Sequence, residues 1–420
     1  MSNDAIAQSN VSPSRVRTVI EYILVYLVVF ASGGLLYQTA QDKFLIGIFG
    51  LCLGAAAVYV RNFSLAFIAY LSAFTLLLWW ISIYTEGSLP ITSVVGSIMQ
   101  LTIAYLVLLI VRERFIGVYV NLIAALAAVS LVGFAIDQIP GLSGLYAFLP
   151  DRGQFYEGVA YAFGYHEHLT RNTSIFFEPA VYQAFLNLAI FLLLFCSPGL
   201  VTKRRMQYLA LLIVALITCA STTGYLIFVL QLLVLVLRAR RLDPRLVTVV
   251  VVGAMSFVVL FYDKVEEVVH DKVAHYLSGS SLEEGVTMRR KFDVLADMRI
   301  FSENLFGAGF RDYGEKFTSL SVGFIRPEEM SGSSNGVTKL LAVYGLPFGM
   351  FVFGSMLVFF FRYVDDFILR LTAIALVGMY FWAETLVLRP LPLMLIASTF
   401  VFSRTIAHSE TPSLRVNGRL

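Results

Sequence analysis

The stretch RNTSIFFEPAVYQ, residues 171–183, places a cation, a carboxylate and a proline where a polar loop leads into an apolar helix. Pro179 predicts that a helix begins here, because proline is well tolerated in the first helical turn. Glu178 comes directly before it and would benefit from the positive end of the helix dipole. Most of the chain is apolar, so we expect chemistry in this stretch and in a second one, residues 289–335.

The composition is that of a membrane protein. Hydrophobic residues make up 58% of the 420 residues and charged residues only 14%, which is outside the range of soluble globular domains. Apolar stretches near twenty residues recur along almost the whole chain, as in helices that cross a bilayer. Lipid-buried backbone must pair internally, and these runs do not alternate as barrel strands do. The sequence therefore predicts an all-α, polytopic integral membrane protein.

We expect about twelve transmembrane helices in a single membrane domain, residues 1–420. The predicted spans are residues 18–37, 44–60, 63–84, 91–111, 116–136, 178–196, 206–220, 224–237, 246–262, 337–361, 369–386 and 388–403. The first apolar segment has the length of a full span, so we interpret it as an uncleaved helix.

Basic residues sort these spans by the positive-inside rule. With the N-terminus inside, the short outside loops hold only Lys43 and Arg389, while most other basic residues, such as the cluster at 203–205, are cytoplasmic. Both termini are then expected in the cytoplasm. Two long loops, residues 137–177 and 263–336, are expected on the opposite side.

Two helix pairs are short for membrane crossings. Residues 206–237 must cross twice, yet a helix of this length rises about 48 Å where two crossings need roughly 60 Å. The apex at 221–224 and the turn carrying Glu384 and Arg389 are therefore expected to lie below the outer surface, around an outward-facing hollow. Tilted or imperfect hairpins are the alternative.

Charged residues in the long loops are the candidate site residues. Arg171 and Glu178 are energetically costly near a membrane unless they are paired, hydrated or functional. The alternative to a functional role is a salt bridge that anchors the loop. Arg289 and Arg290 belong to a basic triplet, and arginine binds phosphate oxygens through two parallel hydrogen bonds. A solvated helix face is the alternative there. Arg311 is a further candidate.

The second long loop is expected to contain two helices. Apolar spacing in residues 265–277 favours a helix that lies on the membrane surface. Met288, Phe292 and Leu295 predict another helix, followed by a turn at Gly307 and Gly309.

No motif for a metal or a cofactor is present. The outer face carries no Asp-x-Asp, and the histidine pairs do not have the usual ligand spacing on a helix. There is no Walker loop, dinucleotide-binding motif or G-x-S-x-G nucleophile. We therefore expect no metal and no cofactor, and no nucleic acid as partner.

Three segments together resemble the motifs of one family. Residues 171–179 place an Arg before an aromatic residue, Glu and Pro. Residues 289–310 follow an Arg-bearing helix with the turn FSENLFGAGF, in which Leu305 stands where proline is common. Ser334 and Asn335 come just before the next span. This order of motifs resembles the O-antigen polymerases, a family that also holds O-antigen ligases.

The resemblance implies metal-independent glycosyl transfer at the periplasmic face of the bacterial inner membrane. A glycan on undecaprenyl pyrophosphate would move onto a fresh lipid-linked repeat unit. Arg171, Arg289 and Arg290 would bind pyrophosphate, and Glu178 would be the base. The two remaining candidates, Asn335 and Arg311, would bind the substrate. A chain-length regulator and a flippase are the partners that the family implies.

Two other functions remain open from the sequence. Ligases typically carry His where this chain has Ser334, which favours a polymerase over a ligase. A flippase for lipid-linked units would also suit twelve spans. Transporters often have two matching halves, however, and the halves of this chain do not match.

Overall fold

The computed structural model describes residues 15–86, 91–139, 155–156, 161–164, 171–196, 203–237, 248, 286–321 and 333–402. Its regular structure is helical, apart from two short strands, Phe155–Tyr156 (β1) and Phe163–Gly164 (β2), which pair antiparallel. The predicted span at 246–262, except for residue 248, and the predicted surface helix at 265–277 lie outside the described residues.

The helices follow the predicted spans closely. In chain order they are α1 (Arg15–Gly33), α2 (Leu35–Thr39), α3 (Gln41–Tyr59), α4 (Leu65–Glu86), α5 (Ile91–Val111), η2 (Arg112–Arg114), α6 (Phe115–Asp137), α7 (Pro179–Phe191), η5 (Leu192–Cys196), α8 (Lys203–Thr218), α9 (Thr222–Leu237), α11 (Val286–Glu303), α12 (Phe310–Ser321), α13 (Gly336–Tyr363), α14 (Phe367–Ala383) and α15 (Pro390–Val401). The predicted helix near residue 288 is confirmed as α11, whereas α12 was not predicted.

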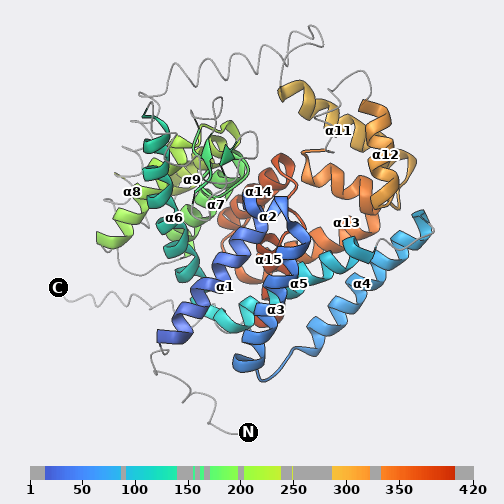
Figure 1. Ribbon diagram of the computed structural model, residues 1–420, viewed down its shortest axis with the longest axis horizontal. Helices are drawn as coiled ribbons and strands as arrows, with labels where there is room; N and C mark the ends of the chain where they lie inside the picture. Colours follow the sequence, from blue (N-terminus) through green and yellow to red (C-terminus); the bar gives the residue numbers. More distant parts are fainter. Residues whose placement is uncertain are drawn as a thin grey trace, which may run out of the picture.

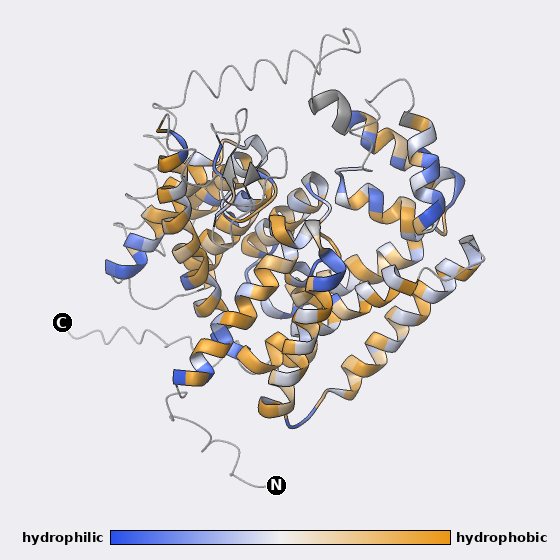
Figure 2. Ribbon diagram, in the orientation of Figure 1, coloured by the Kyte–Doolittle hydropathy of each residue, from blue (hydrophilic) through white to orange (hydrophobic). Residues whose placement is uncertain are grey.

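Six helical segments of the described chain are long and apolar enough to cross a membrane. One of them, Ile91–Asp137, runs for 47 residues and comprises α5, η2 and α6. The apolar helices α9, α14 and α15 are shorter, as the charge pattern predicted for the two hairpins. Figure 2 shows the apolar colour along most of these helices. The chain is a multi-pass helical membrane protein.

The helices form a central group with two flanks (Figure 1). In the centre, α5 packs against α3 and α15, and α1 contacts α5, α6 and α15. On one flank α7 contacts α6, α8 and α9, and α6 contacts α8. On the other flank α13 contacts α4, α11, α12, α14 and α15.

The apolar interior is divided into two clusters. The large one joins α1–α9 and α13–α15. The small one joins α11, α12 and two residues of α13, and consists of Ala296, Ile300, Ala308, Tyr313, Phe317, Ala342 and Val343. Phe310 and Tyr344 pack against both clusters. With this small core, α11 and α12 form a cap on the bundle, which lies at the top right of Figure 1.

The predicted first span is interrupted at Gly34. Instead of running over residues 18–37, α1 ends at Gly33 and the short α2 follows Gly34. Gly34 forms a β-bridge with Phe176, with Leu35 N donating to Ile175 O at 2.9 Å. A side chain at Gly33 would meet Val181 Cγ1 at 2.6 Å, so a glycine is required for this close approach.

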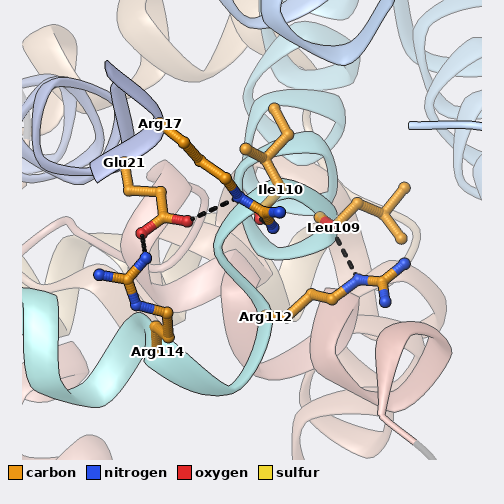
Figure 3. Close-up of polar contacts among 6 residues, drawn as sticks. All are labelled: Arg17, Glu21, Leu109, Ile110, Arg112 and Arg114. Atoms are coloured by element: carbon orange, nitrogen blue, oxygen red, sulfur yellow. Dashed lines mark hydrogen bonds and ion pairs between the residues drawn. The ribbon is translucent and has the colours of Figure 1, made fainter. Parts of the chain in front are cut away.

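A buried carboxylate joins α1 to η2 at the other end of the bundle (Figure 3). Glu21 has no exposed side-chain surface, and its two oxygens pair with Arg17 Nε at 3.1 Å and Arg114 Nη1 at 2.5 Å. Arg17 also donates to the carbonyl of Ile110, at 3.4 Å. Two cations share one buried charge here, which offsets the cost of removing that charge from water.

Further basic side chains lie at this same end. Arg362, near the end of α13, donates to Thr399 O at 2.9 Å. Phe67 links this contact to α5, because its ring packs on Tyr105 at 3.6 Å and on Phe400 at 5.7 Å. The ends of α5, α13 and α15 therefore meet on the side where α1 begins.

Removing both arginine partners of Glu21 is expected to destabilise the fold far more than either single change. Arg17→Gln or Arg114→Gln leaves the buried carboxylate with one cation, whereas the double variant leaves it unpaired, at a cost of about 3–5 kcal/mol. Melting temperatures of the four proteins in detergent complete a double-mutant cycle. Additive losses would contradict this account.

Candidate active site

Asn172 fixes the first motif loop to the helix bundle. The residue is fully buried, and its Nδ2 donates to Ser130 Oγ at 3.2 Å and to Thr218 Oγ1 at 2.9 Å. Its backbone N donates to Thr218 O, and its Oδ1 accepts from Ser174 N. The loop is thereby held between α6 and α8, directly beside Arg171.

Arg171 lies against the turn between α8 and α9. Its Nε donates to the backbone carbonyl of Cys219 at 3.3 Å, and the side chain is partly buried. Ser174 in the loop and Ala220 in the turn both have positive φ, +53° and +49°. Left-handed backbone costs a non-glycine residue about 1–2 kcal/mol and clusters at functional sites, so this strain marks the neighbourhood of Arg171.

Glu178 is placed as the sequence predicted. It is the N-cap of α7, which begins at Pro179, and its side chain makes no capping hydrogen bond. The side chain is exposed, and no ion pair joins it to Arg171 in the described structure. A direct ion pair between these two residues is therefore absent, and the side chain of Glu178 is exposed at the start of α7.

The glycine turn of the second motif supplies hydrogen-bond donors to a break in α13. Gly345 has φ +79°, and Pro347 has no N–H to donate, so the carbonyls of Ala342 and Val343 lose their helical partners. Ala308 N and Gly309 N donate to these two carbonyls at 2.8 and 2.9 Å.

The turn and the broken helix lie backbone to backbone. Leu346 N donates to Leu305 O at 2.8 Å. A Cβ on Gly307 would lie 2.5 Å from Val343 O, and one on Gly345 would lie 2.2 Å from the carbonyl carbon of Phe306. Phe306 also packs on Trp80 of α4, at 5.6 Å between ring centroids. The glycines of this motif therefore serve close packing against α13.

Two buried carboxylates attach α11 to the beginning of α13. Asp293 Oδ2 accepts from Ser334 N at 2.8 Å and from Ser334 Oγ at 2.7 Å. Asp297 accepts from Tyr313 OH at 2.9 Å and from Thr338 Oγ1 at 2.6 Å. Burial raises the pKa of the Asp297 carboxyl. Its hydrogen bonds act in the opposite direction, and the charge of Asp293 adds to the increase.

The other predicted site residues have varied surroundings. Arg289 and Arg290 lie in the first turns of α11, four and three residues before Asp293. Asn335 is buried, and its Oδ1 accepts from Val337 N at 3.0 Å and Thr338 N at 2.9 Å, so it caps α13. Arg311 is 77% exposed and pairs with Glu315 on the same helix at 3.5 Å.

The three motif segments lie at the same end of the bundle, opposite Glu21. Residues 171–178 pack on the α1–α2 junction and on the α8–α9 turn. The α14–α15 turn reaches the same junction, because Leu391 N donates to Ser32 Oγ at 2.9 Å. The first residue of α13 packs against this turn: a Cβ on Gly336 would lie 2.3 Å from Glu384 O.

Sequence reasoning missed several residues of this region. Asp293 and Asp297 have helical i, i+4 spacing and share a face with Ala296 and Ile300, so the predicted helix did carry a signal of their burial. Tyr37 carried no motif signal, although the guanidinium of Arg389 lies over its ring, with Cζ 5.4 Å from the ring centroid.

Known proteins give no direct assignment. No family model matches the chain, and no curated protein matches its sequence. Within the described residues, no group of three or more His, Cys, Asp or Glu side chains could hold a metal ion. The functional argument therefore depends on the motifs and on their geometry.

Gly307→Ala is expected to destabilise the protein, because the new Cβ collides with the backbone of α13 and the positive φ is strained. We expect a loss of about 2–4 kcal/mol, as for other strained or overpacked positions. Gly354→Ala in α13 is the matched control, since nothing lies within 4 Å of its Cβ position. Equal melting temperatures for the two variants would contradict the role of the turn.

Asp297 is expected to make stability depend on pH. Because the folded-state pKa of this carboxyl is raised, its contribution is complete below the unfolded pKa of about 4 and is lost as pH rises through the folded value. Lowering the pH from about 8 to about 5 should therefore raise the melting temperature of the native protein more than that of Asp297→Asn. Parallel pH curves would rule out this assignment.

Proposed function

We propose that this chain polymerises lipid-linked oligosaccharides. In this proposal it is a metal-independent glycosyltransferase that moves a glycan from undecaprenyl pyrophosphate onto a second lipid-linked repeat unit. The product is an O-antigen or a related bacterial polysaccharide. Candidate partners are the lipid-linked glycan, a chain-length regulator and a flippase.

One observation carries the proposal: the three segments that resemble the polymerase motifs gather at one end of the bundle. Residues 171–178 and 333–335 are far apart in the sequence, yet both are tied to the region around the α1–α2 junction and the α14–α15 turn. The second motif joins them through Asp293 and the turn at Gly307. A shared location is what a common active site requires.

The proposed chemistry uses fixed charge. The leaving pyrophosphate gains negative charge as the glycosidic bond breaks, so a preorganised arginine stabilises the transition state more than the ground state. Arg171 is held by Cys219 O beside a strained loop, which suits preorganisation. Arg289 and Arg290 are proposed as the second cationic group on α11.

Glu178 is proposed as the base that takes the proton of the acceptor hydroxyl. It is exposed at the start of α7 and is not engaged in capping that helix. Because no ion pair engages this exposed carboxylate within the described residues, it can contact a substrate without first breaking one. Substrate contacts by Asn335 and Arg311 are weaker parts of the proposal, because Asn335 caps α13 and Arg311 pairs with Glu315.

The proposal includes an orientation. The end that carries Arg17, Arg114 and Arg362 would face the cytoplasm, since basic residues favour that side of the bacterial inner membrane. The motif end would then face the periplasm, with both termini in the cytoplasm. About twelve spans would result if residues 246–262 cross the membrane as predicted.

Substituting the proposed catalytic groups is expected to abolish most polymerisation without loss of folded protein. Glu178→Gln removes the base, and Arg171→Lys or Arg289→Lys removes the two-bond phosphate contact. Each change should raise the activation free energy by about 3 kcal/mol, which lowers the rate about a hundredfold. Glu303→Gln, at an exposed position of α11, is the matched control. Full activity of Glu178→Gln would eliminate the base assignment.

Deleting the gene separates the proposal from its alternatives. The lipid-linked glycans are extracted, sized and assigned to a membrane leaflet. Single repeat units on the outer leaflet are the expected result. Long chains that stay on the lipid would indicate a ligase, and units trapped on the inner leaflet would indicate a flippase.

A further inference from the structure

A groove lies between α4, α13 and α15 at the end of the bundle where α1 begins. It has a volume of about 600 Å³, and its walls include Ser64, Tyr70, Ser355, Val358, Arg362 and Thr399. A second groove, of about 580 Å³, follows α13 and also borders Val358 and Arg362. These two residues are four apart in one helix and share a face, so the two grooves meet there.

The second groove is apolar apart from Arg362. Its other lining residues are Gly354, Leu357, Val358 and Phe361, and the side chains of Val358 and Phe361 are 52% and 60% exposed. A Cβ on Gly354 would have no atom within 4 Å, so open space continues along the helix. On a helix long and apolar enough to cross a membrane, such a surface contacts lipid acyl chains.

Arg362 places a cation at the polar end of this apolar surface. Its Nη1 donates to Thr399 O at 2.9 Å, and its Cζ lies 5.4 Å from the ring centroid of Tyr363. No carboxylate forms an ion pair with it within the described residues. The guanidinium has further N–H donors in a fixed fork, so it can bind a phosphate while it stays anchored to Thr399.

The hydroxyl groups of the first groove differ in what they can offer a ligand. Tyr70 OH donates to Ser355 Oγ at 3.1 Å, and Ser355 Oγ donates to Phe351 O at 2.6 Å, so these two protons are used within the protein. Ser64 Oγ accepts from Phe67 N at 3.3 Å, which leaves its O–H to donate. Arg362 and Ser64 are therefore donors that suit an anionic oxygen.

The charge around Arg362 suits a ligand with a single negative charge. Arg370 of α14 stacks on Phe361 of the second groove, with Cζ 4.9 Å from the ring centroid. Asp365 and Asp366 lie between the two arginines in the sequence, so the segment 362–370 carries no net charge. A polyanion would be repelled by the two carboxylates, whereas one phosphate diester needs only the fork of Arg362.

We propose that the two grooves bind a glycerophospholipid of the surrounding bilayer. Its phosphate diester accepts hydrogen bonds from Arg362 and Ser64, and an acyl chain lies along α13 beside Val358 and Phe361. Basic pockets between transmembrane helices are known to hold lipid head groups. The bound lipid contacts α4, α13 and α15 together and stabilises their packing. This site lies at the end opposite the three motif segments, so it does not depend on the proposed function.

The test measures binding of single lipids to the delipidated full chain in detergent by native mass spectrometry. Phosphatidylglycerol and phosphatidylethanolamine share the phosphate diester and should both bind. Diacylglycerol, which has the acyl chains but no phosphate, should bind more weakly than either. Arg362→Gln should weaken the binding of both phospholipids about tenfold, because hydrogen bonds to a charged group are lost. Arg362→Lys should retain part of the affinity, since the charge remains and the fork does not.

Gly354→Leu tests the apolar groove without changing any charge, and it serves where Arg362→Gln fails to fold because the contact with Thr399 is lost. Leucine favours a helix more than glycine does, and its Cβ meets no atom of the protein within 4 Å, so this variant should fold. The leucine side chain occupies the space of the acyl chain and should weaken phospholipid binding. Added phospholipid should therefore raise the melting temperature of the native protein more than that of Gly354→Leu.

Arg112→Gln is the matched control, since this exposed arginine at the same end also donates to a backbone carbonyl, that of Leu109, and lines neither groove (Figure 3). Native phospholipid affinity in both Arg362→Gln and Gly354→Leu would overturn the inference. Equal binding of diacylglycerol and the phospholipids would also overturn it, because the phosphate would then play no part. Tighter binding of undecaprenyl phosphate than of either phospholipid would assign the grooves to a different lipid and reject the proposal.

Discussion

The structure depends on the requirement that backbone groups inside an apolar environment find partners. Its helices break at Gly34 and at Gly345, and each break is completed by a segment distant in sequence. Phe176 pairs with the first break, and the turn at Gly307 donates to the carbonyls exposed by the second. These supporting segments are the ones that resemble the polymerase motifs. The motifs thus shape the backbone at this end, in addition to any chemistry they perform.

Buried charge follows the same requirement. Glu21 has two arginine partners, and Asp293 and Asp297 each accept two hydrogen bonds. The Nη1 of Arg389, in contrast, is buried without an acceptor within the described chain, and the guanidinium lies over the ring of Tyr37.

Hydropathy and turn chemistry predicted the helices well, because both are local properties. The start of α7 at Pro179 and the turn at Gly307 were evident for this reason. The break at Gly34 was not, since a glycine in an apolar run is compatible with a continuous helix and only the pairing with Phe176 decides otherwise. The packing of Gly336 against Glu384 O was not evident either, because the two residues are distant in sequence and no spacing rule relates them.

The division of α13 has a mechanical consequence. Ala342 and Val343, before the break, pack in the small core with α11 and α12, while Leu340 before it and Phe348 after it pack in the main bundle. This one helix therefore belongs to both cores. The break at Gly345 also leaves two carbonyls to the turn that precedes α12. A displacement of α11 or α12 would thus be passed directly to the main bundle through the backbone of α13.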